Sequence, residues 1–122
     1  MIKLELSTVP PSVNGIWINK PNGRYKSKKG KIFEETARSE LKKQFRCKPL
    51  TSSLEVRIWL YFKDKRKRDI DNYNKGILDA MTNIVYNDDS QIEELNIKKI
   101  VGCGFNKVKI EAEEVNENKY SF

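Results

Sequence analysis

Apolar and polar residues alternate in four stretches of the chain, and this alternation predicts four β-strands that each bury one face. The first stretch covers residues 2–7, and the second and most regular one covers residues 54–62. The other two lie around residues 95–101 and 107–115. Residues 102–106 join this last pair and contain two glycines, so the pattern predicts a β-hairpin there.

Two further segments repeat their apolar residues at helical spacing. In residues 31–46 an apolar side chain recurs every fourth position, which predicts an amphipathic helix that ends before Pro49. Asp71 or Asn72 is a candidate N-cap for a second helix. The apolar face of this second helix is predicted to consist of Tyr73, Ile77, Met81 and Ile84 or Val85.

The segment between the first strand and the first helix shows neither period. Glycine and proline residues recur within residues 14–30, and their presence predicts an irregular and mobile loop. The order β-α-β-α-β-β predicts an α+β fold, a small single domain with a mixed sheet of about four strands and two main helices. We expect this domain to span residues 1–115, and residues 116–122 to form a polar C-terminal tail.

Charge is distributed unevenly along the 122 residues. The net charge is +7, but residues 1–68 contain 18 basic and 6 acidic side chains, whereas residues 69–122 contain 6 and 11. The first part is therefore +12 and the second −5. This asymmetry indicates a polyanionic partner for the N-terminal half and a separate purpose for the carboxylates.

Several function classes are excluded by residues that the chain lacks. It contains no histidine, so imidazole cannot serve as a general base, a nucleophile or a zinc ligand. Its two cysteines, Cys47 and Cys103, lie far apart in the sequence and are expected to be reduced residues that simply pack. No apolar run approaches the ~20 residues of a membrane span, and we expect a cytoplasmic protein.

The acidic residues offer a candidate metal site. In an extended chain, Asp69 and Asp71 would point to the same side, and a divalent cation would relieve their repulsion. Oxygen ligands suit Mg²⁺, or alternatively Mn²⁺, better than zinc. At helical spacing Asp71, Lys75 and Asp79 share one face, and a chain reversal at 86–90 could return a third carboxylate to the first two, Asp69 and Asp71. The alternative is that these are surface aspartates that cap a helix and balance nearby lysines.

Phosphodiester hydrolysis uses carboxylates for the metal and a cation for the charge of the transition state. Two basic segments could track phosphates, although solvated loops are the usual explanation of charge runs. The aromatic residues Trp17, Trp59 and Tyr61 could stack on bases, but packing is the more frequent role of aromatics in strands. The candidate DNA-binding residues in the basic segments are Arg24, Lys26, Lys28, Lys29, Lys65, Arg66, Lys67 and Arg68.

Several motifs together resemble a known family. The sequence R-D-I-D-N at residues 68–72 is followed by Lys75, by D-A at 79–80 and by D-D-S-Q-I at 88–92, and P-P-S-V-N stands at 10–14. These segments closely resemble the RusA family of Holliday junction resolvases, over roughly residues 6–94. The resemblance implies a Mg²⁺-dependent, homodimeric endonuclease of mixed α/β fold that cuts four-way DNA junctions by paired symmetric nicks.

The resemblance also assigns roles to individual residues. Asp69, Asp71 and Asp89 match the family's metal-binding acids, and Lys75 matches its active-site lysine. Asp88 and Asp79 are further candidate ligands, and Asn14 becomes a candidate DNA contact. Because a chain has carboxylates for one site and a junction needs two nicks, a two-fold dimer is expected, with strand 54–62 or strand 95–101 at its interface.

Two other function classes share parts of this pattern. A non-catalytic nucleic-acid-binding protein would need the basic half of the chain without the carboxylate geometry. A structural or toxin-neutralising interaction protein would need neither metal nor DNA.

Overall fold

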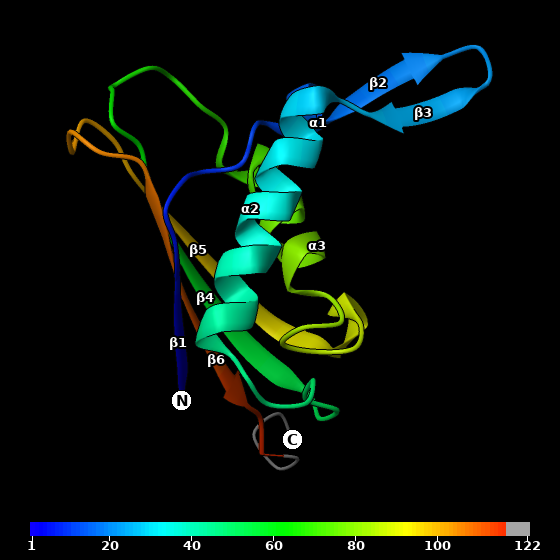
Figure 1. Cartoon of the computed structure of the whole chain (residues 1–122). Helices are drawn as coiled ribbons and strands as arrows, with labels where there is room; N and C mark the ends of the chain where they lie inside the picture. Colours follow the sequence, from blue (N-terminus) through cyan, green and yellow to red (C-terminus); the bar gives the residue numbers. More distant parts are fainter. Residues whose placement is uncertain (117–122) are drawn as a thin grey trace.

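A mixed four-stranded sheet carries two helices on one of its faces (Figure 1). The computed structural model describes residues 1–116. The strands are β1 (Ile2–Leu6), β4 (Leu54–Tyr61), β5 (Ile92–Ile100) and β6 (Lys107–Glu114), in the spatial order β1-β6-β4-β5. The β1–β6 and β6–β4 pairs are antiparallel, and β4–β5 is parallel. The predicted α+β class, the four-stranded mixed sheet and the two main helices are confirmed.

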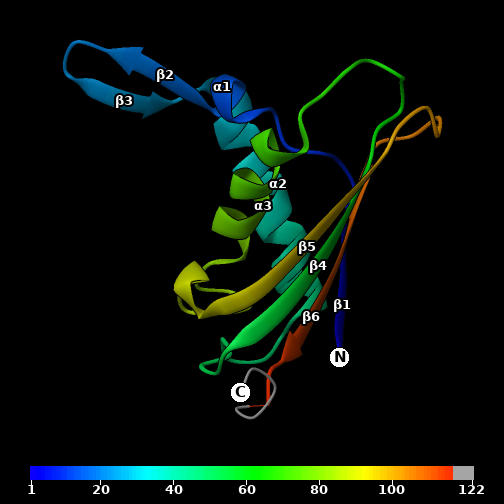
Figure 2. The ribbon, with the colours of Figure 1, turned by 180° about the vertical axis from the view of Figure 1, so that it is seen from behind.

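The alternation in β4 produces the two faces of the sheet. Every second residue from Leu54 to Leu60 is at most 1% exposed, and the residues between them are only half-buried. The buried face packs beneath helices α2 (Lys28–Gln44) and α3 (Asn74–Met81), which lie side by side in both views (Figure 2). The opposite face of the sheet, referred to below as the outer face, has no helix over it.

The predicted hairpin between the third and fourth strands is wrong. Strands β5 and β6 do not pair with each other, because β4 lies between them and bonds to both. Residues 101–106 therefore cross over the end of β4, where the amides of Cys103 and Gly104 donate to the carbonyls of Phe62 and Lys63. The hydrophobic pattern specifies which face of a strand is buried, but not which other strand it pairs with.

The predicted loop at residues 14–30 is also wrong, because most of it is ordered structure. A short helix, α1 (Val13–Ile16), leads into a hairpin of β2 (Trp17–Lys20) and β3 (Gly23–Lys26) that projects from the body (Figure 1). Most of the hairpin is exposed, so there is no buried face to impose an apolar alternation. Helix α2 starts at Lys28, earlier than predicted, because Ser27 caps it by accepting from the Gly30 amide at 3.0 Å.

The predicted cap of the second helix is wrong as well. A 3₁₀ turn, Ile70–Asn72, precedes α3, and neither Asp71 nor Asn72 caps the helix. At its other end α3 stops at Met81, so Ile84 and Val85 are buried but lie beyond the helix. Gly76, which is costly in a helix, is explained by packing: a Cβ there would lie 3.0 Å from Cδ1 of Ile16.

Other expectations concern the cysteines, the membrane and the tail. Both cysteines are free; Cys47 is exposed rather than packed, and Cys103 is half-buried. None of the helices within residues 1–116 has the length and apolar character needed to cross a bilayer. Of the predicted tail, only Asn116 is described, and 117–122 lie outside the described residues.

Candidate active site and nucleic-acid interface

Lys75 connects two acidic residues from different parts of the chain. Its Nζ lies 3.0 Å from Oδ1 of Asp79, one turn along α3, and 3.3 Å from Oδ2 of Asp89. The hydrogen bond to Asp79, together with that to Asp89, raises the pKa of Lys75 above its usual value. The turn before β5 therefore brings Asp89 to Lys75 and Asp79, whereas within residues 1–116 this acid forms no cluster with Asp69 and Asp71, the two acids to which the sequence predicts its return.

The turn that presents Asp89 is built by its neighbours. The Asp88 carboxylate accepts from the Ser90 hydroxyl and from the Ser90 amide at 3.2 Å, and these bonds lower the pKa of Asp88. The Gln91 side chain accepts from the amide of Asp88 at 3.0 Å and donates to the carbonyls of Leu50 and Ser52 at 2.9 and 3.0 Å. Asp88 and Gln91 thus fix the backbone around Asp89.

Asp69 and Asp71 lie immediately before α3, and both are exposed. Asp69 is extended, as expected, but Asp71 belongs to the 3₁₀ turn, so the two do not alternate as in a strand. Within residues 1–116, no three acidic or cysteine side chains come close enough together to hold a metal ion. The structure therefore gathers Lys75, Asp79 and Asp89, and leaves Asp69 and Asp71 outside this group, in the segment that precedes the helix.

The donor chemistry of this region fits a hard cation. All the candidate ligands are carboxylates, and Mg²⁺ prefers oxygen. Two of them, Asp79 and Asp89, already share one positive charge, the ammonium of Lys75. Asp69 and Asp71 are exposed, and the Asp89 side chain is 35% exposed, so all three present oxygens to solvent.

The basic loop, residues 63–68, has an internal framework. Arg68 pairs with Asp64 at 2.8 Å, its guanidinium lies 4.3 Å from the Phe62 ring centroid, and its side chain is only 11% exposed. This hydrogen bond from Arg68 lowers the pKa of Asp64 to about 2. Lys99 donates to the Arg68 carbonyl at 2.5 Å. Arg68 thus shapes the loop, and the exposed cations of the loop are Lys63, Lys65, Arg66 and Lys67.

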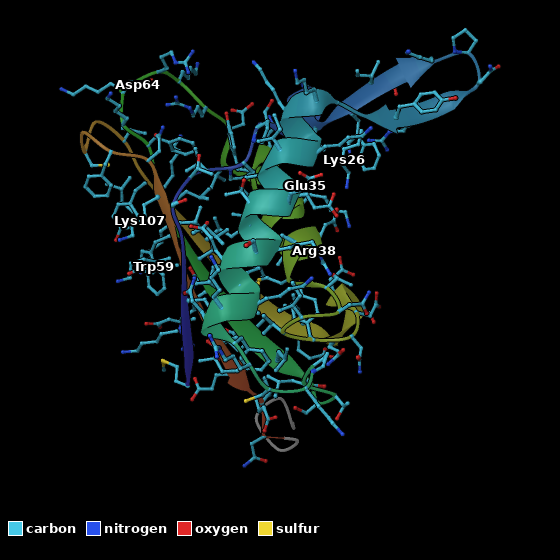
Figure 3. All side chains as sticks on the ribbon, in the orientation of Figure 1. Lys26, Glu35, Arg38, Trp59, Asp64 and Lys107 are labelled. Carbon is cyan, nitrogen blue, oxygen red and sulfur yellow. The ribbon has the colours of Figure 1, made fainter. Side chains whose placement is uncertain are left out.

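A hollow lies between this loop and the N-terminal segment. Lys29, Arg66 and Arg68 contribute positive charge to its lining, and Asp64 contributes one acid. Asn106 also lines it and accepts from the Lys63 amide at 2.8 Å, which ties the basic loop to the β5–β6 crossover. In Figure 3, Asp64 marks the loop on one side of the molecule and Lys26 marks the base of the hairpin on the other.

The β2–β3 hairpin carries the other predicted DNA-binding residues. Arg24 lies 4.6 Å above the Trp17 ring, and Lys26 pairs with Glu34 on α2. A second hollow is lined by Arg24, Trp17 and Asn14, so Asn14 is brought next to the hairpin. Lys28 and Lys29 are exposed in the first turn of α2, where they and the positive end of the helix dipole both favour anions.

Sequence reasoning missed two residues that hold this region in place. Arg38 of α2 donates to the carbonyls of Ala80 and Thr82, at 3.2 and 2.8 Å, and so satisfies the C-terminal end of α3. Gln91 belongs to the D-D-S-Q-I motif at 88–92, but the motif does not reveal that its side chain anchors the turn. No local pattern identifies either of them, because their partners lie about 40 positions away.

Comparisons with known proteins agree with this arrangement. A family model described as Endodeoxyribonuclease RusA matches residues 8–113. The chain is 32% identical over 102 residues to the crossover junction endodeoxyribonuclease RusA of Aquifex aeolicus, which covers 81% of each protein. It is 29% identical over 90 residues to the protein of that name from Enterobacteria phage HK97, covering 72% of this chain and 74% of the relative.

A relative from Escherichia coli strain K12, also named crossover junction endodeoxyribonuclease RusA, is 26% identical over 92 residues, covering 75% of this chain and 77% of the relative. The family model spans both acidic segments, the basic loop and the hairpin. The resemblance seen in the sequence motifs is therefore confirmed, and this chain belongs to the RusA family of endodeoxyribonucleases, enzymes that hydrolyse phosphodiester bonds of DNA.

Proposed function

We propose that this chain is a Mg²⁺-dependent endonuclease that resolves four-way DNA junctions by paired symmetric nicks, acting as a homodimer in the cytoplasm. The proposal is carried by one observation: Lys75 joins Asp79 and Asp89, and the exposed Asp69 and Asp71 lie a few positions before Lys75 in the chain. The names of the relatives from Aquifex and phage HK97 support a junction as the substrate.

The carboxylates divide into ligands and supports. Asp69, Asp71 and Asp89 would hold Mg²⁺, for which Mn²⁺ could substitute, with Asp79 as an additional oxygen donor. When bound, the ion polarises the phosphate and makes water a better nucleophile. Oδ2 of Asp88 accepts from both the amide and the hydroxyl of Ser90, so the role of Asp88 in this proposal is to hold Asp89 in place.

Lys75 supplies positive charge that the metal ligands lack. Its ammonium is held by Asp79 and Asp89, and its raised pKa keeps it protonated at neutral pH. A fixed cation beside the carboxylates reduces their mutual repulsion and stabilises negative charge that develops on the scissile phosphate. Phosphodiester hydrolysis needs such stabilisation of the transition-state charge, and Lys75 can supply it in a chain that has no histidine.

The basic surfaces of the hairpin and the basic loop would bind the arms of the junction. Figure 2 shows the β2–β3 hairpin and the loop between β4 and α3 on opposite sides of the molecule. The loop contains Lys65, Arg66 and Lys67, and the hairpin carries Arg24, which lines a hollow with Asn14 of α1. Lys28 and Lys29 lie between the hairpin and the body of α2. Such contacts bind phosphates without reading sequence, as recognition of DNA shape requires.

The test uses a labelled four-way junction, a linear duplex and a single strand, each with Mg²⁺ or with a chelator. We expect cleavage of the junction alone, in the presence of Mg²⁺, at two positions related by symmetry, with ligatable products. A protein that retards all three DNAs and cuts none would be a non-catalytic binder and would contradict the proposal.

A further inference from the structure

The outer face of the sheet carries a group of aromatic residues that the proposed active site does not use. Trp59 and Tyr61 alternate along β4, the strand that lies between β5 and β6, and both point away from the helices. In Figure 3, Trp59 and Lys107 lie on the opposite side of the sheet from Arg38 on α2. Phe105, which is 48% exposed, extends the group by stacking on Tyr61 with ring centroids 5.6 Å apart.

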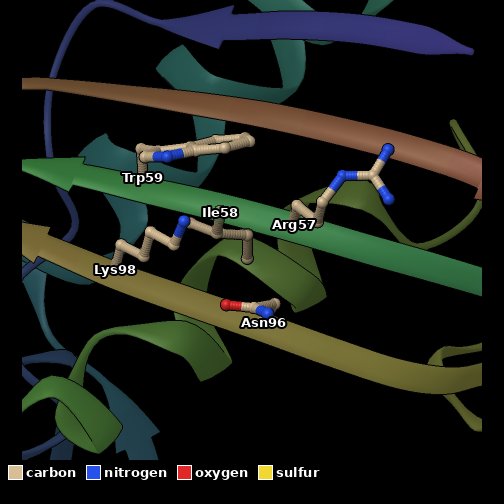
Figure 4. A pocket seen from close by; sticks show the side chains of 5 residues that line it. All are labelled: Arg57, Ile58, Trp59, Asn96 and Lys98. Atoms are coloured by element: carbon tan, nitrogen blue, oxygen red, sulfur yellow. The ribbon is translucent and has the colours of Figure 1, made fainter.

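Lysines flank these rings in register. Trp59 pairs with Lys98 on β5 and with Lys109 on β6, and their ammoniums lie 5.9 and 5.4 Å from the Trp59 ring centroid. Figure 4 shows Trp59 and Lys98 side by side on this face, with the helices behind the strands. In the next row Tyr61 pairs with Lys107, which also contacts Glu5 at 3.0 Å.

The charge of the outer face changes sign along β4. At its other end Glu55, Glu111 and Glu113 surround Arg57, at 2.9, 3.1 and 3.3 Å. These glutamates pair with the arginine and would repel a polyanion. A nucleic-acid-binding surface on the outer face would therefore end before them. At the opposite end, the Lys65 side chain lies against Gly102 in residues 101–106, the segment that also carries Phe105, so the basic loop adjoins this segment.

From this arrangement we propose that the outer face is a second nucleic-acid site, which binds an unpaired strand by stacking bases on Trp59 and Tyr61. Flat sheet faces with aromatics on their central strands and lysines beside them are suited to unpaired bases, whose rings are accessible, and not to duplex DNA, whose rings are covered. Lys98, Lys107 and Lys109 would bind the phosphates. Phe105 offers a third ring where the strand passes towards the basic loop.

The proposal is tested by removing the rings while preserving the strand. Labelled oligodeoxythymidylate is titrated with the wild-type chain, with Trp59→Val/Tyr61→Val and with Trp59→Phe/Tyr61→Phe, and binding is followed by fluorescence anisotropy. The valine pair should weaken binding at least about tenfold, and the phenylalanine pair should stay within about threefold, because every aromatic ring offers a stacking surface. Equal affinities of the two pairs would overturn the proposal.

Charge and position are tested separately. Lys98→Ala/Lys109→Ala should weaken oligonucleotide binding and lower its salt dependence, whereas Lys42→Ala/Lys43→Ala, an equal charge change on the exposed side of α2, should have a smaller effect. The chain has two tryptophans, so in Trp17→Phe the remaining fluorescence reports Trp59. We expect quenching of Trp59 by the oligonucleotide, and its absence would refute stacking at this residue even if the valine pair failed to fold.

Two further measurements distinguish this site from the proposed metal site and from a dimer interface. In the Trp17→Phe background, Asp71→Asn should abolish junction cleavage while the oligonucleotide still quenches Trp59, so failure of the resolvase proposal and failure of this one are distinguishable. Sedimentation of the valine pair should give the wild-type mass. A fall in mass without a loss of oligonucleotide affinity would show that the outer face contacts a second copy of the chain, and would overturn the proposal.

Discussion

Lys75 on α3 and Asp89 in the turn before β5 meet across 14 positions of sequence, with Nζ and Oδ2 3.3 Å apart. Asp79 bonds to the same ammonium at 3.0 Å. The contact depends on the turn that Asp88 and Gln91 build, because the Gln91 side chain anchors this turn to the carbonyls of residues 50 and 52. The second acidic motif is thus brought to the helix by a framework of hydrogen bonds rather than by charge alone.

Lys75→Met should lower the rate of junction cleavage by about 100-fold or more, because the cation next to the reacting phosphate is lost. The folded state should change little, since the pair is well exposed and surface ion pairs contribute about 0–1 kcal/mol. Cleavage rate and thermal melting measured on the same sample separate the two effects. Lys42→Met on α2 is the control, and a Lys75→Met enzyme as fast as this control would remove Lys75 from the site.

Asp71→Asn should abolish junction cleavage and preserve or tighten junction binding. The change removes a proposed metal ligand and one negative charge that repels phosphate. Asp69→Asn and Asp89→Asn should behave in the same way. Cleavage rate and gel-shift affinity are compared on one junction.

The matched control for these acids is Glu35→Gln, an equal charge change at an exposed position of α2. It should cut and bind like the wild type. An aspartate variant that still cuts within a few-fold of this control does not alter a metal ligand, and the corresponding residue would leave the proposed set.

The strands and the main helices could be predicted from the sequence because each buries one face. Residues 54, 56, 58 and 60 point into the core, and this requirement produces the alternation that the pattern detects. The β2–β3 hairpin was missed because Ile18 and Tyr25 are 44% and 48% exposed, so no buried face left a pattern. The order of the strands was missed because β4 separates β5 from β6, and pairing partners do not affect periodicity.

The candidate site was predictable in its residue types and less so in its geometry. The spacing of Lys75 and Asp79 predicted their contact, since helical neighbours four apart must meet. The prediction that Asp69 and Asp71 point to the same side was wrong. It required an extended chain at both residues, but a 3₁₀ turn begins after Asp69. The packing of the Arg68 guanidinium over Phe62 was also not predictable, because no linear motif contains this contact; the DNA-binding role of Arg68 stays a prediction.

Neutralising Lys65, Arg66 and Lys67 together should weaken binding to every form of DNA. Each phosphate contact that is lost should flatten the slope of log K against log salt by up to about 0.9 on duplex. Binding is measured over a range of salt concentrations on junction and duplex. Lys42, Lys43 and Lys48, three exposed lysines elsewhere, provide the control triple, and equal slopes for the two triples would show that the loop is merely solvated.

Arg38→Met should destabilise the fold by about 1.5–3 kcal/mol, the range for hydrogen bonds that involve a charged group. It leaves the carbonyls of Ala80 and Thr82 without their donor but removes no residue of the proposed site. Urea denaturation measures the loss, and Lys42→Met gives the baseline for an exposed cation on the same helix. Stability equal to this baseline would mean that solvent satisfies the end of α3 equally well.

The working unit should be a two-fold dimer, because a junction needs two symmetric nicks and the proposed carboxylate set serves one. Of the two strands expected at its interface, β4 is paired on both edges, whereas β5 is the last strand of the sheet, so β5 is the better candidate.

Sedimentation should give twice the chain mass of 14.3 kDa. Leu95→Asp on β5, at a side chain that is 37% exposed, should shift the protein towards the single-chain mass, because a charge in an interface is costly to bury. Ile32→Asp, at a 53% exposed residue of α2, should leave the dimer intact. If the wild type keeps the single-chain mass with a junction bound, paired nicking by a dimer is excluded, and the cleavage products should then show independent single nicks.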